Sequence, residues 1–231
     1  MLTMLRKSHL FQGATDGEIS RFIAAYPCRV TSYRQGECII SKDQTPAAIG
    51  IVLEGTLGIY TDSFHGGHTL IGIGDQDYLF GFIAMFFNAS KSITTLYCRK
   101  ACTIAHFHIP DGTRPVDFIR TTNPVILANI YAMLTKHIRD DFDRMHLISS
   151  PSVQVRTARY LLHRQAHTGC SQFDLLFNRS ELADYLGMYR TSLSRELKRF
   201  ADNGVIALNR SQVSILDPVQ LITIERNSYA R

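Results

Sequence analysis

Residues 178–206 read NRSELADYLGMYRTSLSRELKRFADNGVI, and this stretch predicts two short helices joined by a tight turn. Asn178 is followed three residues later by Glu181, which is the spacing of a capping box at the start of the first helix. Gly187 ends that helix, because glycine readily adopts the positive φ that a tight turn requires. The pattern is typical of a helix-turn-helix.

The second helix of this pair has an apolar face and a basic face. Leu193 and Leu197 lie one turn apart, and we expect both to face the interior. The opposite face fits the major groove of B-DNA, where an arginine can donate two hydrogen bonds to one guanine and so contribute about 1–3 kcal/mol of discrimination. The residues that we expect to contact DNA are Arg179, Tyr189, Arg190, Thr191, Ser192, Ser194, Arg195 and Lys198.

A hairpin-like stretch follows the two helices and completes the motif. Residues 204–216 read GVIALNRSQVSIL, which is two short β-rich runs around a polar turn. Residues 151–231 hold 11 Lys and Arg against 7 Asp and Glu, so this region carries a net +4 of the +5 of the whole chain. A winged helix-turn-helix with an anionic partner explains this charge, and a solvated basic face is the alternative.

Much of the chain before this motif has a different sequence pattern, which is β-rich and not helical. Residues 29–109 contain short β-rich runs punctuated by glycine, such as AIGIVLEGTLGIYT at 48–61. Strands of this length and spacing predict a β-barrel or jelly roll. The predicted fold class is therefore α+β, with an N-terminal β-barrel or jelly roll, a long helix and a C-terminal winged helix-turn-helix.

A long helix is predicted between the two regions. Residues 124–149 have a helical pattern, and a helix of that length spans about 39 Å. Such helices often pair with a second copy of themselves, as coiled coils do, and packing on the chain's own β domain is the alternative. The stripe that we expect to form the dimer interface consists of Ile126, Ile130, Met133 and His137.

These patterns divide the chain into three parts. We predict an effector-sensing β domain over 1–115, a long dimerisation helix over 116–150 and a DNA-binding domain over 151–231. Pro151 is a natural boundary between the last two, because proline interrupts a helix.

Composition excludes several other classes of protein. A content of 45% hydrophobic and 19% charged residues is ordinary for a globular domain. No apolar run approaches the roughly 20 residues that cross a bilayer, and the N-terminal stretch lacks the apolar core of a signal peptide. The five cysteines form no CxxC pair, which favours reduced thiols. We therefore expect a cytoplasmic protein with no membrane partner.

Four stretches resemble motifs of the CRP/FNR family of bacterial transcription regulators. Two of them match the β domain and two match the DNA-binding domain of that family. They are YRQGECIISKDQ at 33–44, IVLEGTLGIY at 51–60, VRTARYLLHRQA at 155–166 and GMYRTSLSRELKRF at 187–200.

The resemblance implies a homodimer that binds a double-stranded DNA operator and works with RNA polymerase. It places Arg190 and Arg195 on the two arginines of the family's recognition helix. Thr191 stands at the position of the family's base-reading glutamate, which accepts a hydrogen bond from cytosine. The usual half-site of the family is therefore not expected.

The resemblance also points to the place where a cyclic nucleotide would bind, within FGFIAMFFNASKSITT at 80–95. Phe82 stands where the family's ribose-binding glutamate lies, and Ser92 and Ile93 stand where its phosphate-binding arginine and serine lie. A cyclic phosphate is an anion and normally needs a cation within reach. We therefore expect an effector other than cyclic AMP.

The same stretch is unusually aromatic, which allows two interpretations. It could line a pocket for an apolar or aromatic small molecule, or its side chains could fill the space that a nucleotide would occupy. The residues predicted for an effector pocket are Phe80, Gly81, Phe82, Met85, Phe86 and Ser92.

Histidines offer a further sensing chemistry, because imidazole binds zinc, copper and iron. The sequence does not identify a cofactor, but a haem- or metal-dependent regulator that senses redox state or a gas remains an alternative, and a cupin-type metalloenzyme is a remote one. We expect that the protein is not an enzyme, because cupin-like ligand spacing is incomplete. The histidines considered for a metal are His65, His68, His106 and His108.

Overall fold

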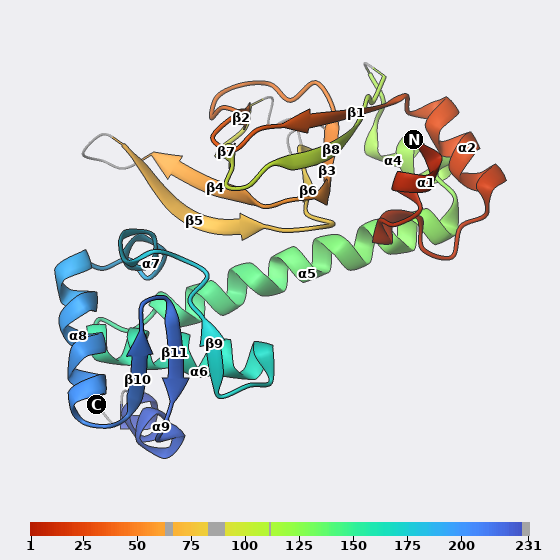
Figure 1. Ribbon diagram of the computed structural model, residues 1–231. Helices are drawn as coiled ribbons and strands as arrows, with labels where there is room; N and C mark the ends of the chain where they lie inside the picture. The colour runs from red at the N-terminus through yellow and green to blue at the C-terminus, as the bar shows by residue number, and fades with distance from the viewer. Residues whose placement is uncertain (63–66, 83–90, 111, 228–231) are drawn as a thin grey trace. The chain divides into compact units, whose positions relative to one another are not determined.

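The computed structural model groups the chain into two compact units, Met1–Arg139 and Asp140–Arg231 (Figure 1). The residues that it describes are 1–62, 67–82, 91–110 and 112–227.

The first unit combines a set of helices with two β-sheets. Its helices are α1 (Leu2–Leu5), the 3₁₀ turn η1 (His9–Phe11), α2 (Asp16–Ala25), α4 (Pro115–Thr121) and the greater part of α5 (Pro124–Ile148). Its strands are β1 (Cys28–Tyr33), β2 (Cys38–Ile40), β3 (Ile49–Glu54), β4 (Leu57–Asp62), β5 (His68–Gly74), β6 (Leu79–Phe80), β7 (Thr95–Cys98) and β8 (Cys102–Phe107).

The strands form two four-stranded antiparallel sheets, with the orders β1-β8-β3-β6 and β2-β7-β4-β5. Val52, Leu57, Leu96 and Ile104 are buried between the sheets. Strand β3 is apolar and buried at four successive positions because its sheet is covered on both faces, by the second sheet and by helices. The predicted jelly-roll class of the N-terminal region is confirmed.

Helices α1, α2 and α4 gather around the first turns of α5 (Figure 1). Helix α2 begins with the capping box formed by Thr15 and Glu18, and Glu18 also accepts a hydrogen bond of 2.8 Å from Asn123 just before α5. The side chain of Asn129 on α5 donates to the backbone carbonyls of Leu10 and Gln12, at 3.0 and 2.8 Å. These contacts attach α5 to the N-terminal segment.

One face of α5 is buried in the hydrophobic core of the first unit. Ile126, Ile130 and Met133 are at most 6% exposed and pack with residues of the first sheet and of α2. The prediction that this stripe forms a dimer interface is therefore wrong. The alternative that the sequence left open, packing on the chain's own β domain, is observed.

His137 continues the buried stripe at its C-terminal end. Its ring lies 4.5 Å from the ring of Tyr78, measured between centroids, at an interplanar angle of 31°. Burial is the main cause that lowers the pKa of His137 to about 4, and Lys136 lowers it further. The half-buried imidazole of His137 therefore packs on a tyrosine of its own unit.

The second unit contains the C-terminal helices and a small sheet. Its elements are the end of α5, α6 (Val153–Thr168), β9 (Gln172–Asp174), α7 (Arg179–Tyr185), α8 (Arg190–Asp202), β10 (Ile206–Asn209), β11 (Gln212–Ile215) and α9 (Pro218–Arg226). The strands form an antiparallel sheet in the order β10-β11-β9, and the core includes Leu161, Leu182, Leu197 and Val213. Two helices followed by a hairpin confirm the predicted winged helix-turn-helix.

The helical region predicted as one element over 116–150 is two helices. Helix α4 ends at Thr121, and Asn123 starts α5 by accepting a hydrogen bond of 2.8 Å from the backbone of Val125. The division between the two compact units falls within α5. None of the described helices is long and apolar enough to cross a membrane.

Candidate nucleic-acid interface

The turn between α7 and α8 has the local structure that its sequence predicted. The side chain of Asn178 accepts hydrogen bonds from the backbone NH groups of Ser180 and Glu181, and the carboxylate of Glu181 accepts one from the backbone NH of Asn178. Gly187 has a φ of +62°, which is unfavourable for other residues. The turn closes through the backbone bond of 2.9 Å from Met188 to Ala183.

Helix α8 is amphipathic, and its buried face sets its orientation. Leu193, Leu197 and Phe200 are at most 1% exposed. Glu196 also lies toward the interior and accepts a bond of 2.7 Å from Arg199. Burial raises the pKa of Glu196, while Arg199 opposes that change. The apolar side chains pack one face of α8 against the core of the second unit, and Glu196 lies on the same face. The opposite face is exposed to solvent.

The outer face of α8 carries most of the residues predicted to contact DNA. Ser192 is half-buried and the other members of the set on this helix are exposed. Within the described part of the chain, no ion pair involves Arg190, Arg195 or Lys198. The exposed members are Tyr189, Arg190, Thr191, Ser194, Arg195 and Lys198.

Arg179 is an exception among the predicted DNA contacts. It is half-buried at the first position of α7, and its Nη1 atom is hidden from solvent. Burial lowers the pKa of its guanidinium, and the nearby Tyr160 acts in the opposite direction. A guanidinium directed into its own domain does not fit the predicted role, so Arg179 is not retained as a DNA contact.

Arg156 on α6 holds the turn in place, a role that the sequence analysis did not assign. Its Nη1 atom donates to the backbone carbonyls of Leu186 and Gly187, at 2.8 and 2.6 Å. Hydrogen bonds from a charged group to a carbonyl are worth about 1.5–3 kcal/mol. The two acceptors are 30 and 31 residues away in sequence, and no local pattern signals such a contact.

The wing carries one further exposed cation. Arg210 lies in the turn between β10 and β11 with a φ of +53°, a conformation seldom adopted by residues other than glycine and asparagine. The polar run NRSQ at 209–212 signals the turn in the sequence, but the sequence analysis did not name Arg210 as a DNA contact.

Phe80 and Phe82, two of the residues predicted for an effector pocket, fill space in the first unit. Phe80 is buried between the two sheets, where its ring occupies the space above Gly50 and leaves no room for a side chain there. The ring of Phe82 packs edge-on against Phe118, on the helix-covered side of the first sheet. Gly81, between them, has a φ of +80°. Met85 and Phe86 lie outside the described residues.

Ser92 forms hydrogen bonds with residues close to it in the β domain. Its hydroxyl donates to the carbonyl of Thr94 at 2.7 Å, and its backbone NH donates to the carbonyl of Gln44 at 2.8 Å. Lys91 beside it is exposed. The described part of the stretch therefore supplies no inward-facing cation for a phosphate.

An apolar cavity lies between the first sheet and the helices that cover it. It has room for about one water molecule, far below the ~300 Å³ of small-molecule sites. The side chains around it include Leu10, Phe22, Ile51, Phe82, Phe118 and Ile130.

The histidines considered for a metal do not form a site among the residues that the structure describes. His68 lies 3.4 Å from Asp62, and His106 is bonded to the hydroxyl of Tyr33 at 3.0 Å. His108 contacts the carbonyl of Ala47 at 3.2 Å. His65 lies outside the described residues. No group of three metal-binding side chains in the described regions includes His68, His106 or His108.

Comparisons with known proteins agree with this architecture. A model of the cyclic nucleotide-binding domain matches residues 30–110, and a model of the Crp-like helix-turn-helix domain matches residues 155–224. The two matches correspond to the two-sheet domain and to the domain that contains α8. The fold and the site together define a winged helix-turn-helix regulator with a nucleotide-binding-type β domain.

The relatives are named as transcription regulators. Transcriptional activator protein Anr of Pseudomonas protegens is 32% identical over 110 residues, which is 46% of this chain and 45% of that protein. FnrA of Stutzerimonas stutzeri, also named a transcriptional activator, is 24% identical over 196 residues, which is 83% of this chain and 78% of that protein. The chain thus spans less than half the length of some curated relatives that it matches, 45% for this Anr and 43% for that of Pseudomonas aeruginosa.

A solved structure shows the same fold. The regulator CLP of Xanthomonas campestris, described as responsive to c-di-GMP, matches with a TM-score of 0.69 at 20% identity, over 87% of this chain and 99% of that chain. From the two domain matches and these relatives, the chain belongs to the CRP/FNR family of transcription regulators. The names of these relatives describe regulators of transcription, which agrees with the expectation that this protein is not an enzyme.

Replacing Arg156 by methionine should destabilise the second unit by about 1.5–3 kcal/mol, because the carbonyls of Leu186 and Gly187 lose their charged donor. Urea denaturation followed by circular dichroism measures the change. Arg190→Met removes an exposed arginine from the same domain and should stay within about 0.5 kcal/mol of the unsubstituted protein. Equal stability of the two variants would show that the hydrogen bonds from Arg156 to the carbonyls of Leu186 and Gly187 do not stabilise the turn.

Proposed function

We propose that the protein is a homodimeric, sequence-specific DNA-binding regulator of transcription. The observation that supports this most strongly is the outer face of α8, which presents Arg190, Arg195 and Lys198 to solvent while leucines anchor the opposite face. Such a regulator acts on chromosomal DNA in the cytoplasm and contacts RNA polymerase there.

In this proposal, the outer face of α8 enters the major groove of DNA. Arg190 and Arg195 are long enough to reach base edges, where each can donate two hydrogen bonds to a guanine. Thr191 has a methyl group and a hydroxyl in place of a carboxylate, so it does not select cytosine as a glutamate does. Lys198 and the wing residue Arg210 suit contacts to phosphates, which add affinity without sequence preference.

Replacing Arg195 by alanine should weaken binding to the specific site by about 1–3 kcal/mol per half-site, roughly 5- to 150-fold, because the guanine loses its bidentate partner. The site is first obtained by selecting random duplexes with the unsubstituted protein. Fluorescence anisotropy on that site and on a scrambled duplex then gives both dissociation constants. Arg190→Ala should behave in the same way.

Arg226→Ala is the matched control, because it removes one exposed arginine from α9, away from the recognition helix. It should lower the affinity for both duplexes equally and slightly. If Arg195→Ala kept the full preference for the selected site, α8 would not be the reading helix.

The proposed dimer uses a second face of α5. Four large apolar side chains are exposed on it, and three of them, Tyr131, Ile138 and Met145, are spaced by seven residues, as along a coiled-coil seam. At ~100° per residue this face lies about 90° around the helix from Ile130. Phe142, the fourth, lies on the same side and is 61% exposed. A second copy of the chain would cover this face.

Ile138→Asp should convert dimers to monomers while leaving the fold intact, because Ile138 is 56% exposed in the single chain. Ile130→Asp should instead lower the stability of the first unit by several kcal/mol, because Ile130 is 5% exposed and a buried carboxylate has no partner there. Light scattering gives the mass and thermal denaturation gives the stability. An Ile138→Asp protein that remains dimeric would contradict the proposed interface.

The proposed effector is not cyclic AMP. In the described part of the stretch, Phe80 and Phe82 fill space on either side of the first sheet and Ser92 bonds to its own turn. None of these side chains can neutralise a phosphate. Because no group of three potential metal ligands among the described residues includes His68, His106 or His108, a haem or metal sensor in the β domain is the less favoured alternative.

Isothermal titration with cyclic AMP should give no binding tighter than about 1 mM, and the melting temperature should not change. The same titration with 5′-AMP controls for weak nonspecific binding of nucleotides. A stoichiometric cyclic AMP complex with micromolar affinity would overturn this part of the proposal while leaving the DNA-binding part in place.

A further inference from the structure

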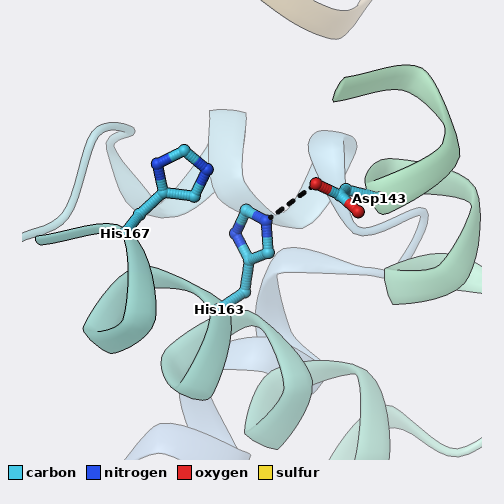
Figure 2. A group of neighbouring side chains, drawn as sticks. All are labelled: Asp143, His163 and His167. Atoms are coloured by element: carbon cyan, nitrogen blue, oxygen red, sulfur yellow. Dashed lines mark hydrogen bonds and ion pairs between the residues drawn. The ribbon is translucent and has the colours of Figure 1, made fainter. Parts of the chain in front are cut away.

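A cluster of three metal-binding side chains lies in the second unit, apart from the outer face of α8. His163 and His167 are on α6 and Asp143 is near the end of α5, and Figure 2 shows His163 between the other two. One potential ligand atom from each residue lies within 4.8 Å of the others. None of these three residues is among the metal ligands predicted from the sequence.

The spacing of the two histidines follows from the helix. Residues four apart in an α-helix lie on the same face, one turn from each other. The ring centroids of His163 and His167 are accordingly 4.9 Å apart. This HxxxH arrangement places two imidazoles where one ion can reach both.

The third ligand comes from a different helix, which makes the cluster a product of tertiary structure. Nε2 of His163 lies 3.5 Å from Oδ2 of Asp143. In a tetrahedral site with metal–ligand bonds of about 2.0–2.1 Å, neighbouring ligand atoms are about 3.3 Å apart. The pair therefore already has nearly the required separation, and a ligand atom of His167 lies within 4.8 Å of both.

The ligand types and their exposure define the class of ion. Two imidazoles and one carboxylate suit zinc and the related divalent ions of cobalt, nickel and copper, whereas magnesium and calcium prefer sites made of oxygen atoms. The side chains of His163 and Asp143 are 32% and 44% exposed, so an ion can enter from solvent. Water can occupy the remaining coordination positions.

We propose that Asp143, His163 and His167 bind one divalent transition-metal ion, and that this ion ties the last turns of α5 to α6. A contact of a different kind already joins the two helices, because Arg159 on α6 donates to the carbonyl of His146 on α5 at 2.8 Å. The bound ion would be a second link between α5 and α6 within the same unit. This inference stands independently of the proposed DNA binding.

The test is a titration of the full-length protein with cobalt(II), followed by its visible absorption, after removal of metals with a chelator. The exposed thiols of Cys38 and Cys170 are first replaced by serine so that they do not compete for the metal. We expect one equivalent of cobalt with the spectrum of a nitrogen and oxygen site, displaced by zinc. Zinc should also raise the melting temperature.

His163→Ala and His167→Ala should each weaken metal binding by at least about tenfold, because each removes one of three ligands. Asp143→Asn is a conservative third variant, since an amide is a poorer ligand than a carboxylate. His146→Ala is the matched control, because it removes a largely exposed histidine on α5 that is not part of the cluster. It should bind the metal like the unsubstituted protein.

Each variant is compared with the unsubstituted protein by circular dichroism without metal, and we expect the same spectrum. If folded His163→Ala and His167→Ala proteins bound cobalt as tightly as the control, or if the unsubstituted protein bound no cobalt or zinc at micromolar concentrations, the proposed site would be refuted.

Discussion

The burial of one face of α5 is the constraint on which the rest of this structure depends. Ile126, Ile130 and Met133 are removed from water against the first sheet and α2, and burial of each such side chain contributes about 1.5–3 kcal/mol. That packing fixes the rotation of the helix about its axis. Ile138 on α5 is consequently left exposed to solvent.

The presentation of α8 depends on contacts that never touch DNA. Leucines and a phenylalanine hold its inner face, and Arg156 fixes the preceding turn through two backbone carbonyls. A recognition helix held in this way loses little conformational freedom on binding, so its contacts to DNA carry a smaller entropic cost. The same residues that stabilise the domain thereby determine which side chains of α8 are exposed to solvent.

The β domain keeps the architecture of a nucleotide-binding fold with different chemistry in its interior. Phe80 fills the space between the sheets, and Phe82 is directed to the helix-covered side. An apolar interior disfavours a charged phosphate, because an anion without a partner is costly to remove from water. Among the described residues of the stretch at 80–95, the positions that the resemblance assigns to a glutamate and an arginine hold Phe82 and Ser92, which supply no charged partner for a phosphate.

The sequence alone determined the features that depend on neighbours a few residues apart. The capping boxes of α2 and α7, the positive φ of Gly187 and the amphipathic face of α8 all follow from spacings of three or four residues, and the strands follow from their apolar runs. The tertiary structure decided which face of α5 is buried, since periodicity shows that a stripe exists but not what covers it. It also decided the Arg156 contact with the turn, the inward position of Arg179 and the cluster of Asp143, His163 and His167. Those features join residues far apart in the chain, and only the packing of helices brings such residues together.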